Sequence, residues 1–274
     1  MAAESALEFW RPIRETIREN QANPNELVFD LLACLSSPNS ELRDSIAYEM
    51  LTYWLRNEAL SEESRISVLQ LLSLNLSKRG VSNSLERSFS ALVLSELLRS
   101  DNLDAFMSDA LRSELLVEVV DALDEESDYR GLVQGLGWIH PIAHMADVLW
   151  RFSLHGELTA EQTRLVLQAV RSKAGTRQAA YAFNEGDRLA RPVAVIVARQ
   201  ALPDTELIQW LDSFGSPQSS ASWFDSFSSP EGMLELHNSK LFVRALADQL
   251  IGVEMGDGLR AKIDELVALF TSLV

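Results

Sequence analysis

Cysteine is almost absent from this chain of 274 residues, because Cys34 is its one thiol. A single thiol cannot form an internal disulfide, which excludes a disulfide-stapled secreted scaffold and any zinc site built from several cysteines. Cys34 lies in the apolar run FDLLACL. We therefore expect a small buried hydrophobe there and not a reactive nucleophile.

Glycine and proline are also few, at 12 and 8 residues, which argues against a sandwich or barrel rich in tight turns. The chain has neither a GxGxxG nor a Walker-type loop, so nucleotide binding has no support. The longest apolar stretches, such as 192–198, are far shorter than the roughly 20 residues that cross a bilayer. The N-terminal segment has no unbroken apolar run, so we expect no signal peptide and a cytoplasmic location.

Basic residues are outnumbered, with 24 Lys and Arg against 40 Asp and Glu and a net charge of −16. Such a charge repels nucleic-acid phosphate and anionic lipid, so we expect neither a nucleic acid nor a membrane as a partner. A basic partner is the electrostatic expectation. The hydrophobic share of 47% is enough for a sizeable core and excludes wholesale disorder.

Helical signals run through nearly the whole chain, and strand alternation is almost absent. Asn23 before Pro24 is typical of a helix start, and Thr159 followed by Gln162 predicts a capping box. The run Val193–Val197 is rich enough in β-branched residues for a strand, but its alanines favour a helix. The sequence therefore predicts an all-α fold.

Three segments share one pattern, in which an apolar helix end is followed by a polar turn and an arginine that opens a second apolar helix. The segments are 31–51, 119–139 and 178–198. Their arginines are Arg43, Arg130 and Arg188, and each could reach the acidic turn or the carbonyls that close the previous helix. This pattern predicts a HEAT-like stack of antiparallel helix pairs, an α-solenoid, that forms one domain over residues 1–274.

A segment rich in Ser, Gly and Pro at 212–232 interrupts the helices. It contains three aromatic residues: Trp223, Phe224 and Phe227. We expect a long loop or a short helix that these aromatics hold against the body, and the alternative is a lid over a groove. Helices are expected near 238–252 and 257–273.

The string GLGWIHPIAHMADVLW holds the main candidate site. His140, His144 and Asp147 follow one another at spacings of four and three residues, which place them on one helical face. Such a set could hold a divalent metal ion, although no cofactor is evident otherwise. The alternative is a pair of histidines hydrogen-bonded to acids, with Asp147 orienting His144. Pro141 favours His140 as the residue that precedes a new helix.

An acidic turn lies just before this string. We expect Glu126 and Asp128 to pair with arginines and a helix to span 128–139. Stacking of equivalent helices would then bring Arg87 and Arg130 to one rim, beside Trp138 and the histidines. Ser88 and its neighbours lack a GxSxG elbow, so we do not expect a serine hydrolase.

The strings RSFSALVLS, ExDxRG and GWIHPIAHMAD resemble an uncharacterised bacterial family called domain of unknown function 2785. The resemblance implies a right-handed, HEAT-like helical stack in a bacterial cytoplasm, and it carries no established activity. It groups eight residues of this chain into one motif set: Arg87, Ser88, Asp128, Arg130, Trp138, His140, His144 and Asp147. Pro141 and Met145 depart from the family pattern.

Two functions follow from these observations. The first is a binding module that holds a protein, a peptide or a small ligand on a concave helical surface. The second is a metal-binding protein or an acid–base enzyme that uses His140, His144 and Asp147, so whether the chain is an enzyme stays open.

Overall fold

The structure is a computed structural model that describes residues 3–19, 22–218 and 220–273. About 72% of the chain is helical, and within the described ranges the strands form a single two-stranded sheet. The all-α prediction is therefore confirmed. The run Val193–Val197 lies inside a helix, as its alanines indicated. None of the helices in the described ranges has the length and apolar character that a membrane crossing requires.

Contacts between Cα atoms divide the chain into two compact units. Unit 1 comprises residues 1–122 and 126–148, and unit 2 comprises 123–125 and 149–274. The prediction of one domain over residues 1–274 stays a prediction, and each unit is described by itself.

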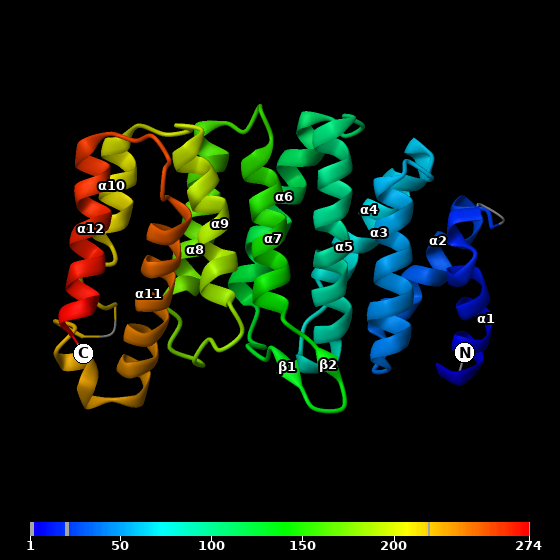
Figure 1. Cartoon of the computed structure of the whole chain (residues 1–274), viewed down its shortest axis with the longest axis horizontal. Helices are drawn as coiled ribbons and strands as arrows, with labels where there is room; N and C mark the ends of the chain where they lie inside the picture. Colours follow the sequence, from blue (N-terminus) through cyan, green and yellow to red (C-terminus); the bar gives the residue numbers. More distant parts are fainter. Residues whose placement is uncertain (1–2, 20–21, 219, 274) are drawn as a thin grey trace. The chain divides into compact units, whose positions relative to one another are not determined.

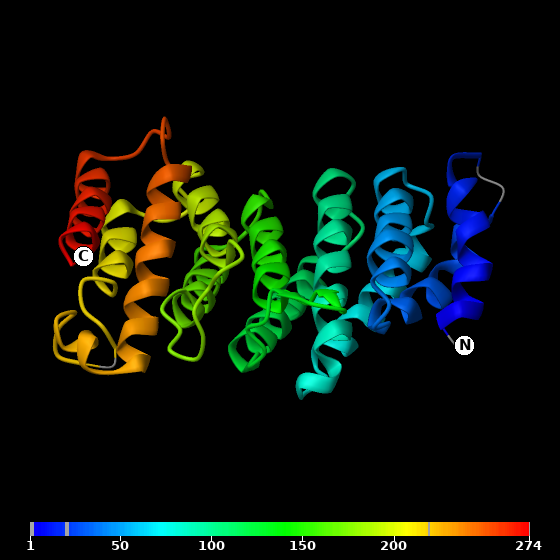
Figure 2. The same ribbon diagram turned by 60° about the horizontal axis from the view of Figure 1, so that its bottom comes forward.

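Unit 1 contains the following elements in chain order (Figures 1 and 2): α1 Ala3–Glu15, the 3-10 turn Ile17–Glu19, α2 Pro24–Leu32, the 3-10 turn Ala33–Ser36, the π-helix η3 Glu41–Tyr48, α3 Glu49–Arg56, α4 Glu62–Leu76, the 3-10 turn Val81–Asn83, α5 Ser84–Leu103, most of α6 Asp109–Glu125, β1 Leu132–Val133, β2 Gly137–Trp138 and the first half of α7 Pro141–Leu154. Its core lies between α4 and α5, which pack along their length. Leu72, Leu94 and Leu97 are fully buried there.

Unit 2 contains the end of α7 and five further α-helices: α8 Ala160–Ala174, α9 Glu185–Ala198, α10 Asp204–Asp212, α11 Pro230–Gln249 and α12 Asp257–Ser272, with a 3-10 turn at Asp225–Ser228. In both views α9 and α11 lie side by side. The predicted capping box is present, because the Thr159 hydroxyl accepts a hydrogen bond from Gln162 N and the Gln162 side chain accepts one from Thr159 N.

The described part of segment 212–232 is largely a loop with the short 3-10 turn Asp225–Ser228, but two details of the prediction are wrong. Of its three predicted anchoring aromatics only Trp223 is buried, donating from its indole N to the Phe214 carbonyl at 3.2 Å, whereas Phe224 and Phe227 are exposed. The next helix begins at Pro230, because Ser229 caps it by accepting a hydrogen bond from Gly232 N.

Candidate functional site

The connection from α6 to α7, residues 126–140, is a loop and a β-hairpin. The predicted helix over 128–139 is therefore wrong, and Arg130 does not open a helix. Gly135 and Gly137 adopt φ values of +83° and +78°, a left-handed conformation that an L side chain resists and that no right-handed helix contains. Three glycines within seven residues favour a turn, and this local signal outweighs the repeat pattern.

The hairpin closes at its base and leads directly into α7. Ile139 N donates to the Gly131 carbonyl at 2.9 Å, and His140 N donates to the Arg130 carbonyl at 3.0 Å. His140 has a φ of +54°, outside the helical region, and α7 begins at the following proline as predicted. The backbone conformation of His140 thus sets the direction in which α7 leaves the hairpin.

A buried ion pair fastens the start of this connection to α5. The Arg87 guanidinium donates to both carboxylate oxygens of Glu126, at 2.8 and 2.9 Å, and it also donates to the carbonyls of Lys78 and Gly80. Glu126 accepts two more hydrogen bonds from the backbone N–H groups of Ser127 and Asp128. Both charged side chains are almost fully buried, so water does not solvate them. Each charge is neutralised instead by its partner in the ion pair.

A second carboxylate organises the next turn. Asp128 accepts hydrogen bonds from the backbone N–H of Arg130 and from its guanidinium, the shortest at 2.6 Å. Burial raises the pKa of Asp128, but hydrogen bonds from Arg130 and Ser84 together hold that pKa below its ordinary value. Arg130 itself is about half exposed.

Ser88 and His144 link α5 to α7. The Ser88 hydroxyl donates to the Ile139 carbonyl, so its oxygen is an acceptor toward His144 Nδ1, which lies 2.7 Å away. Nδ1 also faces the Ser88 carbonyl at 3.2 Å. These partners require a proton on Nδ1. The histidine therefore does not act as a base on this serine, which is the opposite of the arrangement that activates a nucleophile.

Aromatic rings continue from this pair toward the surface. Trp138 stacks on His140 with ring centroids 5.1 Å apart, and the rings of His140 and His144 meet edge to face at 5.8 Å. Phe89 meets His144 in the same way at 5.4 Å. The two histidines are buried, whereas Trp138 is 41% exposed. The buried rings thus hold the exposed Trp138 indole in place.

Arg43 belongs to this site, although the sequence indicated it only as a repeat arginine. Its fully buried guanidinium donates to the carbonyls of Leu136 and Trp138 in the hairpin and to the Ser37 carbonyl. It also lies over the Phe89 ring at 4.7 Å. A contact between residues more than 90 positions apart leaves no local trace in the sequence.

Asp147 is buried one turn after His144 on α7. Burial raises the pKa of the Tyr48 hydroxyl, and the charges of Glu96 and Asp147 raise it further. The charge of Asp147 therefore affects the last side chain of η3. In the residues that the structure describes, no group of three or more His, Cys, Asp or Glu side chains is placed to hold a metal ion. The metal site of His140, His144 and Asp147 stays a prediction.

The candidate residues are thus brought together mostly in pairs: Arg87 with Glu126, Asp128 with Arg130, Ser88 with His144 and Trp138 with His140. We call Arg87, Ser88, Glu126, Asp128 and His144 the clasp, because they hold the segment 126–140 in place.

A family model matches residues 72–247, a range that contains the whole clasp and the hairpin. The chain belongs to the DUF2785 family. This family is described as a protein of unknown function, so membership assigns no activity to the site. No curated protein and no solved structure matches the chain. The clasp residues of this DUF2785 protein lie within the three sequence strings that resemble the family.

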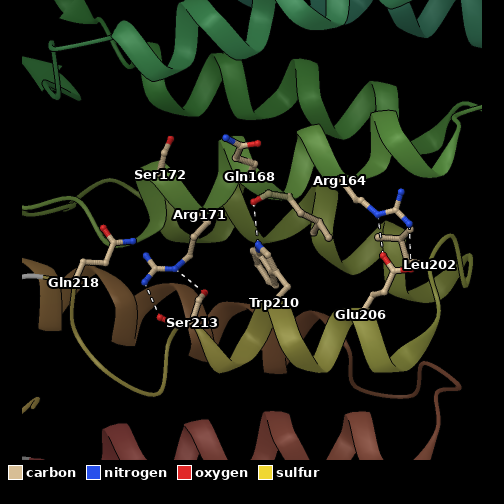
Figure 3. A pocket seen from close by; sticks show the side chains of 10 residues that line it. Arg164, Gln168, Arg171, Ser172, Leu202, Glu206, Trp210, Ser213 and Gln218 are labelled. Atoms are coloured by element: carbon tan, nitrogen blue, oxygen red, sulfur yellow. Dashed lines mark hydrogen bonds and ion pairs between the residues drawn. The ribbon is translucent and has the colours of Figure 1, made fainter.

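Unit 2 carries a groove of about 520 Å³ between α8 and α10 (Figure 3). Three contacts cross it: Arg164 pairs with Glu206 at 2.9 Å, Trp210 donates to the Leu167 carbonyl, and Arg171 donates to Ser213. These contacts tie the two helices together along the groove.

Proposed function

We propose that this DUF2785 protein is a binding protein that recognises a partner protein or peptide through its β-hairpin. The observation that carries the proposal is the exposure of Leu132 and Trp138. These two residues are register partners on neighbouring strands and are 50% and 41% exposed. Their side chains therefore form one apolar pair at the surface of a unit whose other regular elements are helices.

The clasp gives this pair the rigidity that recognition requires. A partner that binds a preordered hairpin does not have to order it, so less binding free energy is lost to conformational entropy. A tryptophan held by stacking on His140 is the residue type that most often anchors protein interfaces. A protein or peptide surface, and not a nucleic acid or a membrane, also suits the net charge of −16.

Catalysis by the same residues has less support. The Ser88 hydroxyl and His144 Nδ1 are directed at each other and at backbone carbonyls, and Glu126 accepts four hydrogen bonds within the chain. Groups saturated in this way hold structure, whereas an acid–base catalyst must have its reactive atom open to substrate.

The proposal includes a HEAT-like stack of helix pairs as the scaffold and the bacterial cytoplasm as the location. The stack is supported by the close packing of consecutive helices, α4 with α5 and α8 with α9. The cytoplasm is supported by the cysteine content, because a chain with the single thiol Cys34 has no internal disulfide to stabilise it in an oxidising compartment.

A photo-crosslinking side chain at Gln134, which is exposed at the hairpin tip, tests the function. We expect a discrete crosslinked product from a lysate of the source bacterium, and we expect Trp138→Ala to remove it. Phe224→Ala is the matched control, because Phe224 is an exposed aromatic residue in unit 2. Crosslinking that survives Trp138→Ala, in a variant with an unchanged melting temperature, would contradict the proposal.

A further inference from the structure

Unit 1 has its own groove, of about 550 Å³, between α4 and α6. Its floor is apolar and consists largely of buried leucines, among them Leu69, Leu76 and Leu115. Leu74 lies at its edge and is 61% exposed. A cavity of this size accommodates several apolar side chains of a ligand.

One wall of the groove is acidic. Glu114, Glu118 and Asp121 line it from α6 and are exposed. Their spacing of four and three residues places all three carboxylates on the same face of α6, over about 10 Å of helix. The facing wall from α4 contributes mainly neutral polar groups, and the Ser73 hydroxyl donates to Glu118.

These three acids have no ion pair with a cation among the described residues. Arg79 lines the same groove from the loop after α4, so one end of the groove is less negative than the rest. The groove of unit 2 differs, because its acid Glu206 is paired with Arg164. In unit 1 the negative charge faces outward beside an apolar floor, and a ligand is left to neutralise it.

We propose that the groove between α4 and α6 binds a basic amphipathic helix of a partner protein. The leucine floor takes the apolar face of that helix, and the row Glu114, Glu118 and Asp121 pairs with Lys or Arg side chains at the same helical spacing. A second copy of this chain fits poorly, since its net charge of −16 repels the acidic wall. This surface is independent of the hairpin.

The probe is a synthetic 18-residue amidated peptide of Leu and Lys, with Leu at helical positions i, i+3, i+4 and i+7. A peptide of identical composition in scrambled order is its control. Binding to the full-length chain is followed by fluorescence anisotropy at low and high salt. We expect the amphipathic peptide to bind at least tenfold more tightly than the scrambled one, with an affinity that falls as salt rises.

Variants locate the binding. The triple variant Glu114→Gln, Glu118→Gln, Asp121→Asn should bind the peptide about tenfold more weakly and with a smaller salt dependence. Its matched control, Glu4→Gln, Glu8→Gln, Glu15→Gln, removes the same charge from exposed positions of α1 and should bind as the unchanged chain does. Leu74→Ala should weaken binding several-fold at every salt concentration, because Leu74 supplies apolar contact.

Equal binding of the two peptides would overturn the proposal, because a diffuse acidic surface would then explain the interaction. Equal weakening by both triple variants would overturn it as well, and so would peptide-induced self-association that places a second copy in the groove. Trp138→Ala should leave peptide binding unchanged. Failure of the groove and failure of the hairpin function are therefore separate results.

Discussion

Two long connections between helices in this protein are held in place by different kinds of contact. The α6–α7 connection in unit 1, residues 126–140, is fastened by the ion pair of Arg87 and Glu126. The α8–α9 connection in unit 2, residues 175–184, is fastened by the neutral amide of Asn238, which is fully buried. Both connections leave regular structure and must satisfy their backbone groups by other means.

Asn238 satisfies three of those groups at once. Its amide nitrogen donates to the carbonyls of Thr176 and Ala179, both at 2.8 Å, and its oxygen accepts from Tyr181 N at 2.9 Å. Tyr181 adds a hydrogen bond from its hydroxyl to the Lys173 carbonyl.

The difference lies in what remains when one partner is lost. Removing an amide leaves neutral backbone groups without partners, whereas removing one member of a buried ion pair leaves a charge in a medium that solvates it poorly. Loss of one partner should therefore lower the free energy of unfolding more in the α6–α7 connection than in the α8–α9 connection. The α6–α7 connection is also the one that contains the hairpin.

The largest effect should come from Glu126→Ala. We expect it to lower the free energy of unfolding by about 3–5 kcal/mol, because it strands the buried Arg87 charge and two backbone N–H groups. Urea denaturation followed by circular dichroism measures the loss. The double variant Arg87→Met, Glu126→Leu should lose less than Glu126→Ala does. A double variant that loses more would show that the ion pair is not the cause.

Asn238→Ala should cost less, about 2–3 kcal/mol, since only neutral groups lose partners. The same denaturation experiment measures it. If this variant were as destabilised as Glu126→Ala, the distinction between a charged and a neutral fastening would disappear.

Gly137→Ala tests how closely the hairpin is held. Its φ of +78° resists an L side chain, and a Cβ there would lie 3.1 Å from the Ser40 Cβ and 3.2 Å from the buried Arg43 guanidinium. We expect a loss of about 1–2 kcal/mol from backbone strain, plus the cost of displacing Arg43. Gly135→Ala is the matched control, because Gly135 has a similar φ of +83° but a Cβ there would have no other atom within 4 Å. Equal losses in the two variants would mean that the contact with Arg43 costs nothing.

Asp128→Asn should lower stability by about 1 kcal/mol at neutral pH, a small value because Arg130 is half exposed. Hydrogen bonds hold the pKa of Asp128 below its ordinary value in the folded chain. A depressed carboxyl pKa stabilises the fold above the unfolded pKa, about 3.9, and that contribution is lost as the pH falls through the folded value. The stability difference between the variant and the unchanged chain should therefore shrink in acid. A difference that is constant from pH 7 to pH 3 would exclude this linkage.

The smallest effect should come from Arg164→Ala in the groove of unit 2. Arg164 is exposed and Glu206 is partly exposed, so water screens their attraction, and we expect no measurable change in melting temperature. A clear destabilisation would mean that the contacts across this groove hold the unit together as the clasp does in unit 1.

Several helix starts could be predicted because their signals are local. Asn23 before Pro24 and the pair Thr159 and Gln162 cap helices through atoms within three residues. The hairpin is not predicted, because the repeat pattern over 119–139 favours a helix against the turn signal of Gly131, Gly135 and Gly137.

The composition of the candidate site could be predicted, but its chemistry could not. The spacing and the family strings identify the two acids and the arginine of the clasp. The direction of the Ser88–His144 hydrogen bond depends on the Ile139 carbonyl, which the hairpin brings to the Ser88 hydroxyl. That direction makes the pair a structural contact between α5 and α7.

Helical structure, an acidic net charge and the lack of an internal disulfide follow from the sequence alone, because they depend on composition and on periodicity within a few residues. Contacts between distant segments are needed to show that Arg43 holds the hairpin, that Arg87 neutralises Glu126 and that the acids of α6 border a leucine groove. These contacts join residues that are roughly 40 to 90 positions apart. Their free energies depend on burial, which strengthens the attraction within a pair and also carries the cost of desolvating its charges. Burial exists only once the helices have packed.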